Sequence, residues 1–334
     1  MKVKIAKKVM ALALSATLLL SLASCELITK TEEGKMKEAV AKVNGHTITR
    51  GEFLKRFETE KARMENLYGK DFFEKKENEA YVNQIKNNLI DNMINEVLLV
   101  KRAEELKVVP DEKTLQDEIN KKIEEGKKSL GGEDKFNETL KNLKITLEDY
   151  KGYLRSGIII DKLYDHIAKD VKVTDDDIKK YYNENIYDYT EKPNKMNVSH
   201  ILVKTEEEAK KVKAELDAGA KFEDLAKKYS QDPGSKDKGG NLGDIYYNDK
   251  NYDKDFMTNA IALPEGKISA PVKTQFGYHI IKINKKEEYK QLPLEKVKAE
   301  IEKKLLDDKK AQAFQDELKK LKDKAKIKIY EERL

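Results

Sequence analysis

The sequence predicts an α+β protein in which a small antiparallel sheet with surrounding helices is inserted into a mostly helical domain. Two segments with alternating apolar residues, around positions 200 and 280, are typical of strands. The segments before and after them carry apolar residues at helical spacing. Near the end of the chain, Ile327 and Ile329 alternate like a single strand that needs partners elsewhere. Because chains of about 300 residues rarely form one core, we expect two structural units.

The first 24 residues have the pattern of a signal peptide. Four lysines within the first eight residues precede an apolar run from 9 to 23, which is too short for a membrane-spanning helix. The run ends in Leu22-Ala23-Ser24-Cys25, which resembles the bacterial lipobox. That resemblance implies cleavage before Cys25, lipidation of this cysteine and a membrane anchor. Since the chain has one cysteine, no intrachain disulfide is expected.

The charges of the chain exclude one class of partner. The first 24 residues hold four of the 67 basic residues and no acidic one, which leaves 63 basic against 62 acidic residues. No basic stripe with interleaved aromatic residues stands out, so we expect no nucleic acid partner. Residues 25–37 are polar and are predicted to be a flexible tether.

Residues 38–194 are predicted to form an N-terminal helical part that begins with a hairpin. Val40 to Ile48 is the hairpin, with Asn44-Gly45 at its turn. Thr49 and Glu52 form a capping box that opens a helix. Its expected buried side carries Phe53, Phe57, Met64 and Leu67.

Four more helices are expected before residue 195. The first runs from about 78 to 106 and ends before Pro110, and the second runs from 111 to Gly131-Gly132. Capping boxes open the other two. Apolar residues at helical spacing in the first are Tyr81, Ile85, Leu89, Met93, Val97 and Val100, and the two boxes are Thr146 with Asp149 and Thr174 with Asp177.

From 195 to 285 the predicted order is a strand, two helices, a glycine-rich loop, a short helix and two strands. Thr205 with Glu208 caps the first helix, and Pro264-Glu265-Gly266 is a turn. Residues 286–334 are predicted to be a helix, from about 294 to 324, followed by a strand. One helix and one strand cannot bury their apolar faces alone, so we expect this tail to complete the helical part.

Two histidines lie on the apolar faces of the predicted strands. His200 alternates with Val198 and Leu202, and His279 shares a face with Ile281. Buried imidazoles need hydrogen-bond partners. The simplest arrangement is that the two rings find each other, directly or through a hydroxyl.

The order of these segments resembles the parvulin family of peptidyl-prolyl isomerases. The resemblance covers about 195 to 285 and rests on Val198–Val203, Gly239–Asp244, Pro271–Thr274 and Phe276–Ile281. It implies a parvulin domain with prolyl isomerase activity and no cofactor. The site residues that it implies are His200, Asp232, Thr274 and His279 for catalysis, and Leu242, Tyr252 and Phe256 for the proline pocket.

With its flanks, the whole chain resembles the PrsA-type foldase lipoproteins, whose helical parts are similar to SurA. This resemblance implies a chaperone role for 38–194 and 286–334, and an anchor on the outer face of a Gram-positive plasma membrane. The expected partners are newly secreted or unfolded polypeptides with Xaa-Pro bonds, with a homodimer left open. Tyr252 replaces a methionine and Phe276 a small polar residue of other members. The alternative is therefore a holdase chaperone whose parvulin domain has little or no activity.

Each of the predicted site residues also has a simpler, purely structural interpretation. His200 and His279 could form a hydrogen-bonded structural pair without a catalytic role. Asp232 precedes Pro233-Gly234 and could cap a loop. No third ligand stands at a recognisable spacing, so the sequence predicts no zinc site. The charges near the pocket do not form a basic cluster, and we expect no preference for a phosphorylated substrate.

Overall fold

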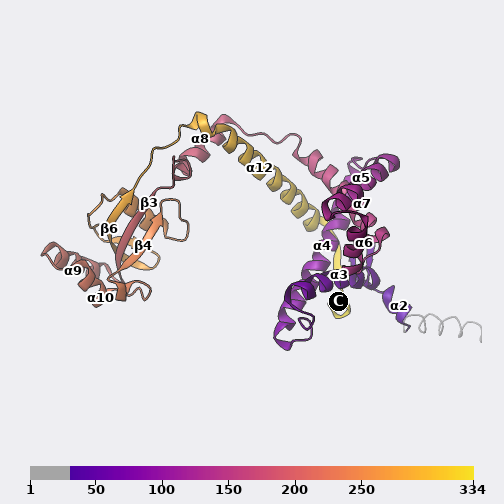
Figure 1. The fold of residues 1–334 in the computed structure, drawn as a ribbon, viewed down its shortest axis with the longest axis horizontal. Coiled ribbons are helices and arrows are strands. Elements are labelled where there is room, and N and C mark those ends of the chain that lie inside the picture. Colours follow the sequence, from indigo (N-terminus) through magenta and orange to yellow (C-terminus); the bar gives the residue numbers. More distant parts are fainter. Residues whose placement is uncertain (1–30) are drawn as a thin grey trace, which may run out of the picture. The chain divides into compact units, whose positions relative to one another are not determined.

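The computed structural model describes residues 31–334, which form two compact units. One unit is Lys172–Asp308, and the other combines residues 31–171 with Lys309–Leu334 (Figure 1). The predicted signal peptide and Cys25 lie outside the described residues. In the part of the chain that is described, no helix is both long and apolar enough to span a membrane.

Six described helices of the first unit precede Lys172, and the capping boxes predicted for two of them are formed. The Thr49 and Thr146 boxes each form both of their reciprocal hydrogen bonds. Gly131, at φ 88°, ends a helix in the left-handed conformation that glycine adopts without strain. The helices are α2 (Glu32–Met36), α3 (Arg50–Tyr68), α4 (Glu79–Glu105), α5 (Glu112–Leu130), α6 (Glu133–Asn142) and α7 (Leu147–Ala168).

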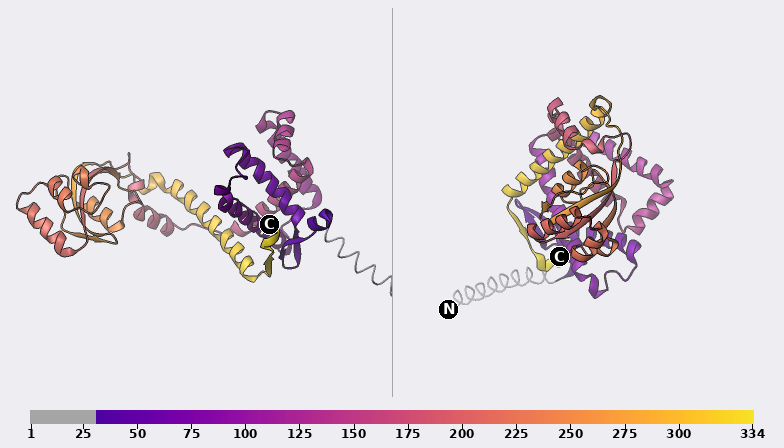
Figure 2. Two further views of the ribbon diagram at one scale, coloured as in Figure 1. Left: turned by 90° about the horizontal axis from the view of Figure 1, so that it is seen from below. Right: turned by 90° about the vertical axis from the view of Figure 1, so that its left-hand side faces the viewer.

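A three-stranded antiparallel sheet joins the two ends of the described chain. The predicted hairpin is β1 (Ala39–Val43) and β2 (His46–Thr49), and β7 (Ile327–Ile329) pairs with β1. Figure 2 shows this last strand, in yellow, beside the N-terminal strands. In the structure, the tail pairs with the first unit, and Lys172–Asp308 lies in the sequence between the two parts of that unit.

Some expected contacts in this unit are different. Leu67 and Tyr81 were placed on buried faces, but their exposed fractions are 63% and 46%. Both lie near the α3–α4 connection, Leu67 in the last turn of α3 and Tyr81 in the first turn of α4. On α4 the buried face is rotated from the predicted stripe and includes Ile90, Met93, Ile94, Leu98, Leu99 and Ala103.

The predicted tether also differs at its end. Residues 32–36 form α2, whose first turn is capped by the side chain of Thr31. Gly34 of this helix is buried, and α2 packs against α3. The capping hydrogen bond and this contact order a segment whose polar composition predicted flexibility.

The second unit contains a four-stranded antiparallel sheet with the order β4-β3-β6-β5. The strands are β3 (Lys195–Val203), β4 (Asn241–Tyr246), β5 (Val272–Thr274) and β6 (Gly277–Glu287). The segment of β4 was predicted to be a glycine-rich loop. It forms a strand because it pairs with β3 along its length, with an irregularity near Gly243. The helices are α8 (Asp175–Glu184), α9 (Glu206–Asp217), α10 (Phe222–Tyr229) and α11 (Lys254–Ala262).

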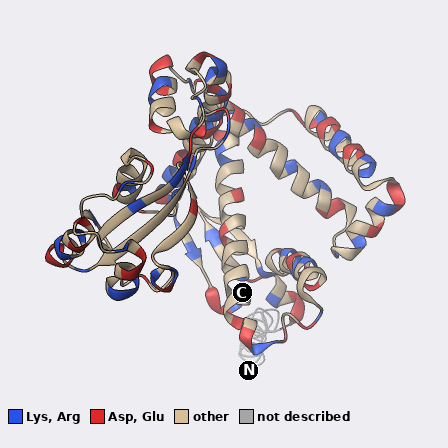
Figure 3. Cartoon of the chain, turned by 60° about the vertical axis from the view of Figure 1, so that its left-hand side comes forward, with Lys and Arg blue, Asp and Glu red and all other residues tan. Residues whose placement is uncertain are grey.

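Helices cover both faces of this sheet. Ile201 and Val203 of β3 pack with α9 and α10, whereas Met196 and Val198 pack on the side of α11. The alternation places His200 on the α11 side, as the sequence predicts. Lysines and acidic residues are interspersed along the helices of the chain (Figure 3).

Helix α12 (Leu294–Lys324) contributes to both units. Val297 and Ile301 pack with Tyr182 and Tyr189 in a small core of the second unit. Phe314 and the following apolar residues pack on the core of α4, α5, α6 and α7. The second unit is therefore wider than the expected 195–285, because α8 and the first turns of α12 pack together beside the sheet.

Candidate functional site

The histidine pair is built on the two central strands of the second unit. His200 on β3 and His279 on β6 are 6% and 5% exposed. The Nδ1 atoms of the two rings are 3.0 Å apart, and the rings are stacked with centroids 5.2 Å apart. The rings therefore contact each other directly, which is the arrangement that the apolar strand faces predict.

Asp232 lies at one end of this pair. Its Oδ2 atom is 2.8 Å from Nε2 of His200. Ser235 donates a hydrogen bond from its hydroxyl to the same carboxylate oxygen, and its Oγ is 3.1 Å from Nε2 of His200. Oδ1 of Asp232 accepts the N–H of Gly234. The carboxylate is thus both the partner of His200 and the cap of its own loop.

Thr274 lies at the other end. Its Oγ1 is 2.9 Å from Nε2 of His279 and accepts the backbone N–H of Phe276 at 3.1 Å. Phe276 itself is 64% exposed. The hydroxyl of Thr274 thus lies at the end of a chain of hydrogen bonds that runs from Asp232 through both histidines.

The protonation of the two rings sets the direction of the hydrogen bonds in this chain. The Asp232 carboxylate can only accept, so Nε2 of His200 carries a proton. When both rings are neutral, Nδ1 of His200 accepts from Nδ1 of His279, and Nε2 of His279 accepts from the hydroxyl of Thr274.

The surroundings of the rings keep them neutral. Burial lowers the pKa of His200, although the hydrogen bond to Asp232 opposes this effect. Burial and the neighbouring His200 lower the pKa of His279 to about 4. Burial alone would raise the pKa of Asp232, but hydrogen bonds from Ser235, His200 and Gly234 outweigh it and lower that pKa. At neutral pH the chain holds one negative charge, on Asp232.

An aromatic wall covers the histidine pair. Phe256 of α11 is buried and makes edge-on contacts with both imidazoles, at centroid distances of 5.9 Å from His200 and 5.2 Å from His279. Tyr252 stacks on Phe256 with centroids 5.8 Å apart. Leu242 of β4 is partly buried against the same core. The predicted proline-pocket residues thus lie together beside the predicted catalytic residues.

Two glycines allow the backbone to close around the site. Gly240 has φ 84°, and a Cβ atom there would lie 2.4 Å from the carbonyl oxygen of His200. Gly277 has φ 133°, and its Cβ would lie 2.4 Å from the carbonyl oxygen of Val203. No side chain fits at either position, because the nearest atoms belong to the backbone of the strand that carries His200.

Sequence reasoning missed Ser235. It is 1% exposed and contacts both Asp232 and His200. Its position three residues after Asp232, across the turn of Pro233-Gly234, was a usable signal, because serine often bonds to a nearby turn residue. Within residues 31–334 no cluster of three or more histidine, cysteine or acidic side chains could hold a metal ion.

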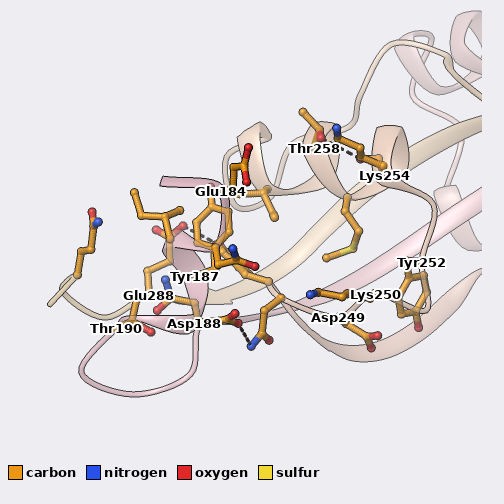
Figure 4. A pocket seen from close by; sticks show the side chains of 18 of the residues that line it. Glu184, Tyr187, Asp188, Thr190, Asp249, Lys250, Tyr252, Lys254, Thr258 and Glu288 are labelled. Carbon is orange, nitrogen blue, oxygen red and sulfur yellow. Dashed lines mark hydrogen bonds between the residues drawn. The ribbon is translucent and has the colours of Figure 1, made fainter. Parts of the chain in front are cut away.

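A large cleft lies on the other side of Tyr252. It has a volume of about 1080 Å³ and is lined by α11, by residues 184–194 and by the segments around 248 and 289 (Figure 4). The histidine pair does not line it. Of the site residues predicted from the described chain, only Tyr252 does. We refer to this hollow as the α11 cleft.

Comparisons with known proteins agree with both units. The PPIC-type PPIASE domain family matches residues 173–299, and the SurA-like N-terminal domain family matches residues 2–164. Foldase protein PrsA of Clostridium botulinum strain Hall is 45% identical over 334 residues, which cover 99% of each chain. Foldase protein PrsA of Clostridium kluyveri is 44% identical over 309 residues, covering 89% of this chain and 90% of the relative.

Among solved structures, peptidylprolyl isomerase PrsA from Bacillus anthracis is 34% identical. The match covers 70% of this chain and 96% of that chain, with a TM-score of 0.34. Sequence identity over nearly the full length of the curated relatives, together with the domain match over the unit that holds the histidine pair, identifies the family. The chain belongs to the PrsA foldases and carries a peptidyl-prolyl isomerase domain of the PPIC, or parvulin, type.

Proposed function

We propose that the site formed by His200, Asp232, Thr274 and His279 isomerises Xaa-Pro bonds of secreted polypeptides on the outer face of the membrane. The observation that carries this proposal is the continuous hydrogen-bonded chain from Asp232 to Thr274, beside the aromatic wall of Phe256. A purely structural pair would be satisfied without a carboxylate that is partly open to solvent.

The chemistry asks for no covalent bond to the protein. Rotation about the prolyl amide crosses a barrier of about 20 kcal/mol, because conjugation is lost in the twisted state. As conjugation is lost, the carbonyl oxygen loses negative charge. A fixed carboxylate near that oxygen therefore disfavours the planar ground state more than the twisted state. Asp232 supplies this charge, and an apolar pocket of Phe256, Tyr252 and Leu242 holds the proline ring away from water.

The neutral histidines act through Asp232 and Thr274. Their hydrogen bonds hold the Asp232 carboxylate and the Thr274 hydroxyl in fixed orientations. Because the pKa values of both histidines are low, the rings carry no positive charge that would cancel the negative charge of Asp232. His200 and His279 are therefore positioning residues, and Asp232 is the group that faces the substrate.

The test is the prolyl isomerase activity of the purified protein on a short peptide with one Xaa-Pro bond. Asp232→Ala should lower kcat/KM by about two orders of magnitude, the usual scale for a positioned polar group. Asp232→Asn keeps the shape but not the charge, and should lose most of the same activity. Circular dichroism and thermal unfolding would confirm that both variants fold. Full activity in a folded Asp232→Ala variant would contradict the proposed site.

A specific feature also supports a chaperone role for the first unit. Leu67, Tyr68 and Tyr81 are exposed at the α3–α4 connection, and Tyr68 contacts Phe72, whose ring also meets that of Tyr81. Exposed apolar side chains in one place are typical of a protein-binding surface. We propose that this aromatic surface holds unfolded clients.

Suppression of aggregation of a denatured model protein would test the aromatic surface. Tyr68→Ser with Tyr81→Ser should weaken suppression and leave turnover of the short peptide unchanged. Asp232→Ala should instead lower turnover of the short peptide and leave the suppression of aggregation unchanged. If both changes leave suppression intact, the holding surface lies elsewhere.

The membrane anchor rests on the lipobox alone. We propose that Cys25 is lipidated and that the mature protein begins there, on the outside of a Gram-positive plasma membrane. Mass spectrometry of the protein from its native membrane should find a diacylglycerol-modified Cys25. A Cys25→Ala variant that stays with the membrane in cell fractionation would overturn the proposal.

A further inference from the structure

We propose that the α11 cleft binds the segment of the substrate polypeptide that flanks the isomerised proline, with a preference for basic and apolar side chains. The inference rests on the proposed function, because it starts from a proline held at Phe256. It adds a second contact surface in the same unit, so that an extended substrate would be bound on two sides of α11.

One side chain connects the cleft with the predicted proline-binding residues. The ring of Tyr252 stacks on Phe256, which contacts both histidines, and Tyr252 also lines the cleft. Figure 4 shows Tyr252 at one end of the cleft, with Tyr187 and Thr190 toward the other. A substrate held at Tyr252 would therefore have the cleft next to it.

The walls of the cleft are held in place before any ligand binds. Asn248 donates a hydrogen bond to Asp188 at 2.7 Å, and the side chain of Asn194 accepts the backbone N–H of Tyr289 at the same distance. Tyr247 also donates its backbone N–H to the carbonyl of Asn194. These bonds tie together three segments that are far apart in the sequence, so binding would require little ordering of the protein.

The lining matches a peptide better than a small polar ligand. Tyr187 and Tyr247 meet edge to face with centroids 5.3 Å apart, and the side chains of Met257 and Ile261 add apolar surface. Clefts that bind small molecules typically enclose about 300–1,000 Å³. The volume of about 1080 Å³ is large enough for several side chains of an extended polypeptide.

The charge of the lining selects among peptides. Four carboxylates and two lysines line the cleft, which is an excess of two negative charges. Glu184 and Glu288 also lie 4.0 and 3.7 Å from Lys180 and Lys286, which do not line the cleft. Such an excess favours basic segments through the complementarity of charge, and disfavours acidic ones. The charged residues are Glu184, Asp188, Asp249, Glu288, Lys250 and Lys254.

Two neighbouring residues of α11 give a matched pair of variants. Thr258 and Asn259 are both exposed on this helix, but only Thr258 lines the cleft. Thr258→Trp would fill the cleft, and Asn259→Trp adds the same ring outside it. Neither residue belongs to the predicted site. Each variant is tested in the purified protein with a short Xaa-Pro peptide and with a longer peptide, in which lysine and leucine residues flank the same Xaa-Pro bond.

For the long peptide, Thr258→Trp should raise KM about tenfold, the effect of losing one well-buried anchoring contact, and leave kcat nearly unchanged. The short peptide should be turned over equally by wild type, Thr258→Trp and Asn259→Trp. Equal KM values for the long peptide in both tryptophan variants would overturn the proposal.

Binding of a fluorescent long peptide whose proline is replaced by alanine gives a readout that does not depend on turnover. Fluorescence anisotropy should show weaker binding to Thr258→Trp than to Asn259→Trp. If wild type fails to isomerise the short peptide, the proposed function is wrong, and this measurement still decides the role of the cleft. Equal binding by the two variants would refute the cleft as a binding site.

A charge reversal tests the selectivity. Glu184→Lys, at the exposed end of α8, should reduce affinity for the lysine-containing peptide and increase affinity for the same peptide with glutamates, each by several-fold. Unchanged affinity for both peptides would show that the negative charge of the cleft does not select its ligand.

Discussion

The two units stabilise buried polar groups in opposite ways. In the second unit, His200 and His279 are buried as neutral rings that share one ordered chain of hydrogen bonds. In the first unit, Arg56 of α3 and Glu96 of α4 form a two-pronged ion pair with bonds of 2.6 and 3.0 Å. Arg56 also lies 4.9 Å from the ring centre of Tyr153 on α7. Two opposite charges thus join three helices in the first unit, whereas in the second unit two neutral rings are buried and the only charge of their hydrogen-bonded chain is on Asp232 at its end.

The difference follows from what each site does. An ion pair that is about a quarter exposed still keeps some water, and its attraction offsets the cost of burying both partners. To hold the helices together, Arg56 and Glu96 need only keep their two hydrogen bonds. The proposed isomerase mechanism instead requires one uncompensated negative charge at Asp232. A positively charged histidine beside it would cancel that charge.

The largest effect is expected from breaking the ion pair of the first unit. Glu96→Ala leaves the Arg56 guanidinium partly buried without its partner, which should lower the free energy of unfolding by about 3 kcal/mol. The double variant Arg56→Met with Glu96→Leu should cost less than Glu96→Ala alone. Chemical denaturation would measure both, and activity on a short peptide should be unchanged. A double variant less stable than the single one would contradict this account.

An effect of similar size is expected from the pH dependence of the histidine pair. The pKa of His279 is about 4 in the folded protein, against an ordinary value of 6.5. Between these pH values the unfolded chain binds a proton that the folded protein does not. This contribution to stability should therefore be complete well above pH 6.5 and fall by about 3 kcal/mol as the pH drops towards 4. His279→Gln should flatten much of this slope, and the remainder comes from His200 and from carboxylates such as Glu96 and Asp232, whose pKa values are also lowered.

The smallest effect is expected from Ser235→Ala, and it concerns chemistry more than stability. The substitution removes a hydrogen bond to Asp232, so the pKa of Asp232 should rise and the free energy of unfolding should fall by about 1 kcal/mol. The acid limb of the pH profile of kcat/KM should then move to higher pH. Ser235→Thr keeps a hydroxyl and should restore the wild-type profile. A profile that does not move in Ser235→Ala would make Ser235 a structural residue only.

Local patterns in the sequence predicted most of the secondary structure. The boxes at Thr49, Thr146, Thr174 and Thr205 all cap helices, because a capping box is complete within four residues. Period-two alternation likewise placed both histidines on one face of one sheet. The contacts among the predicted site residues came from the resemblance to the parvulins, since no local rule joins Asp232 to a ring 32 residues away.

What the sequence did not predict depends on contacts between distant segments. The segment of β4 has three glycines around it and little alternation, and it becomes a strand only because β3 offers it a free edge. The α11 cleft is lined from three parts of the chain and has no pattern in any one of them. On α4, the buried face depends on where α7 and β1 pack, which helical spacing alone does not specify.

The pairing of β1 with β7 also determines the order in which the protein can be completed. A chain that is made from its N-terminus presents the hairpin early, but the strand that completes its sheet follows only after all strands of the isomerase unit. The isomerase unit can therefore fold while the first unit still has an unpaired strand edge, and each new copy of this foldase is for a time itself an incompletely folded chain.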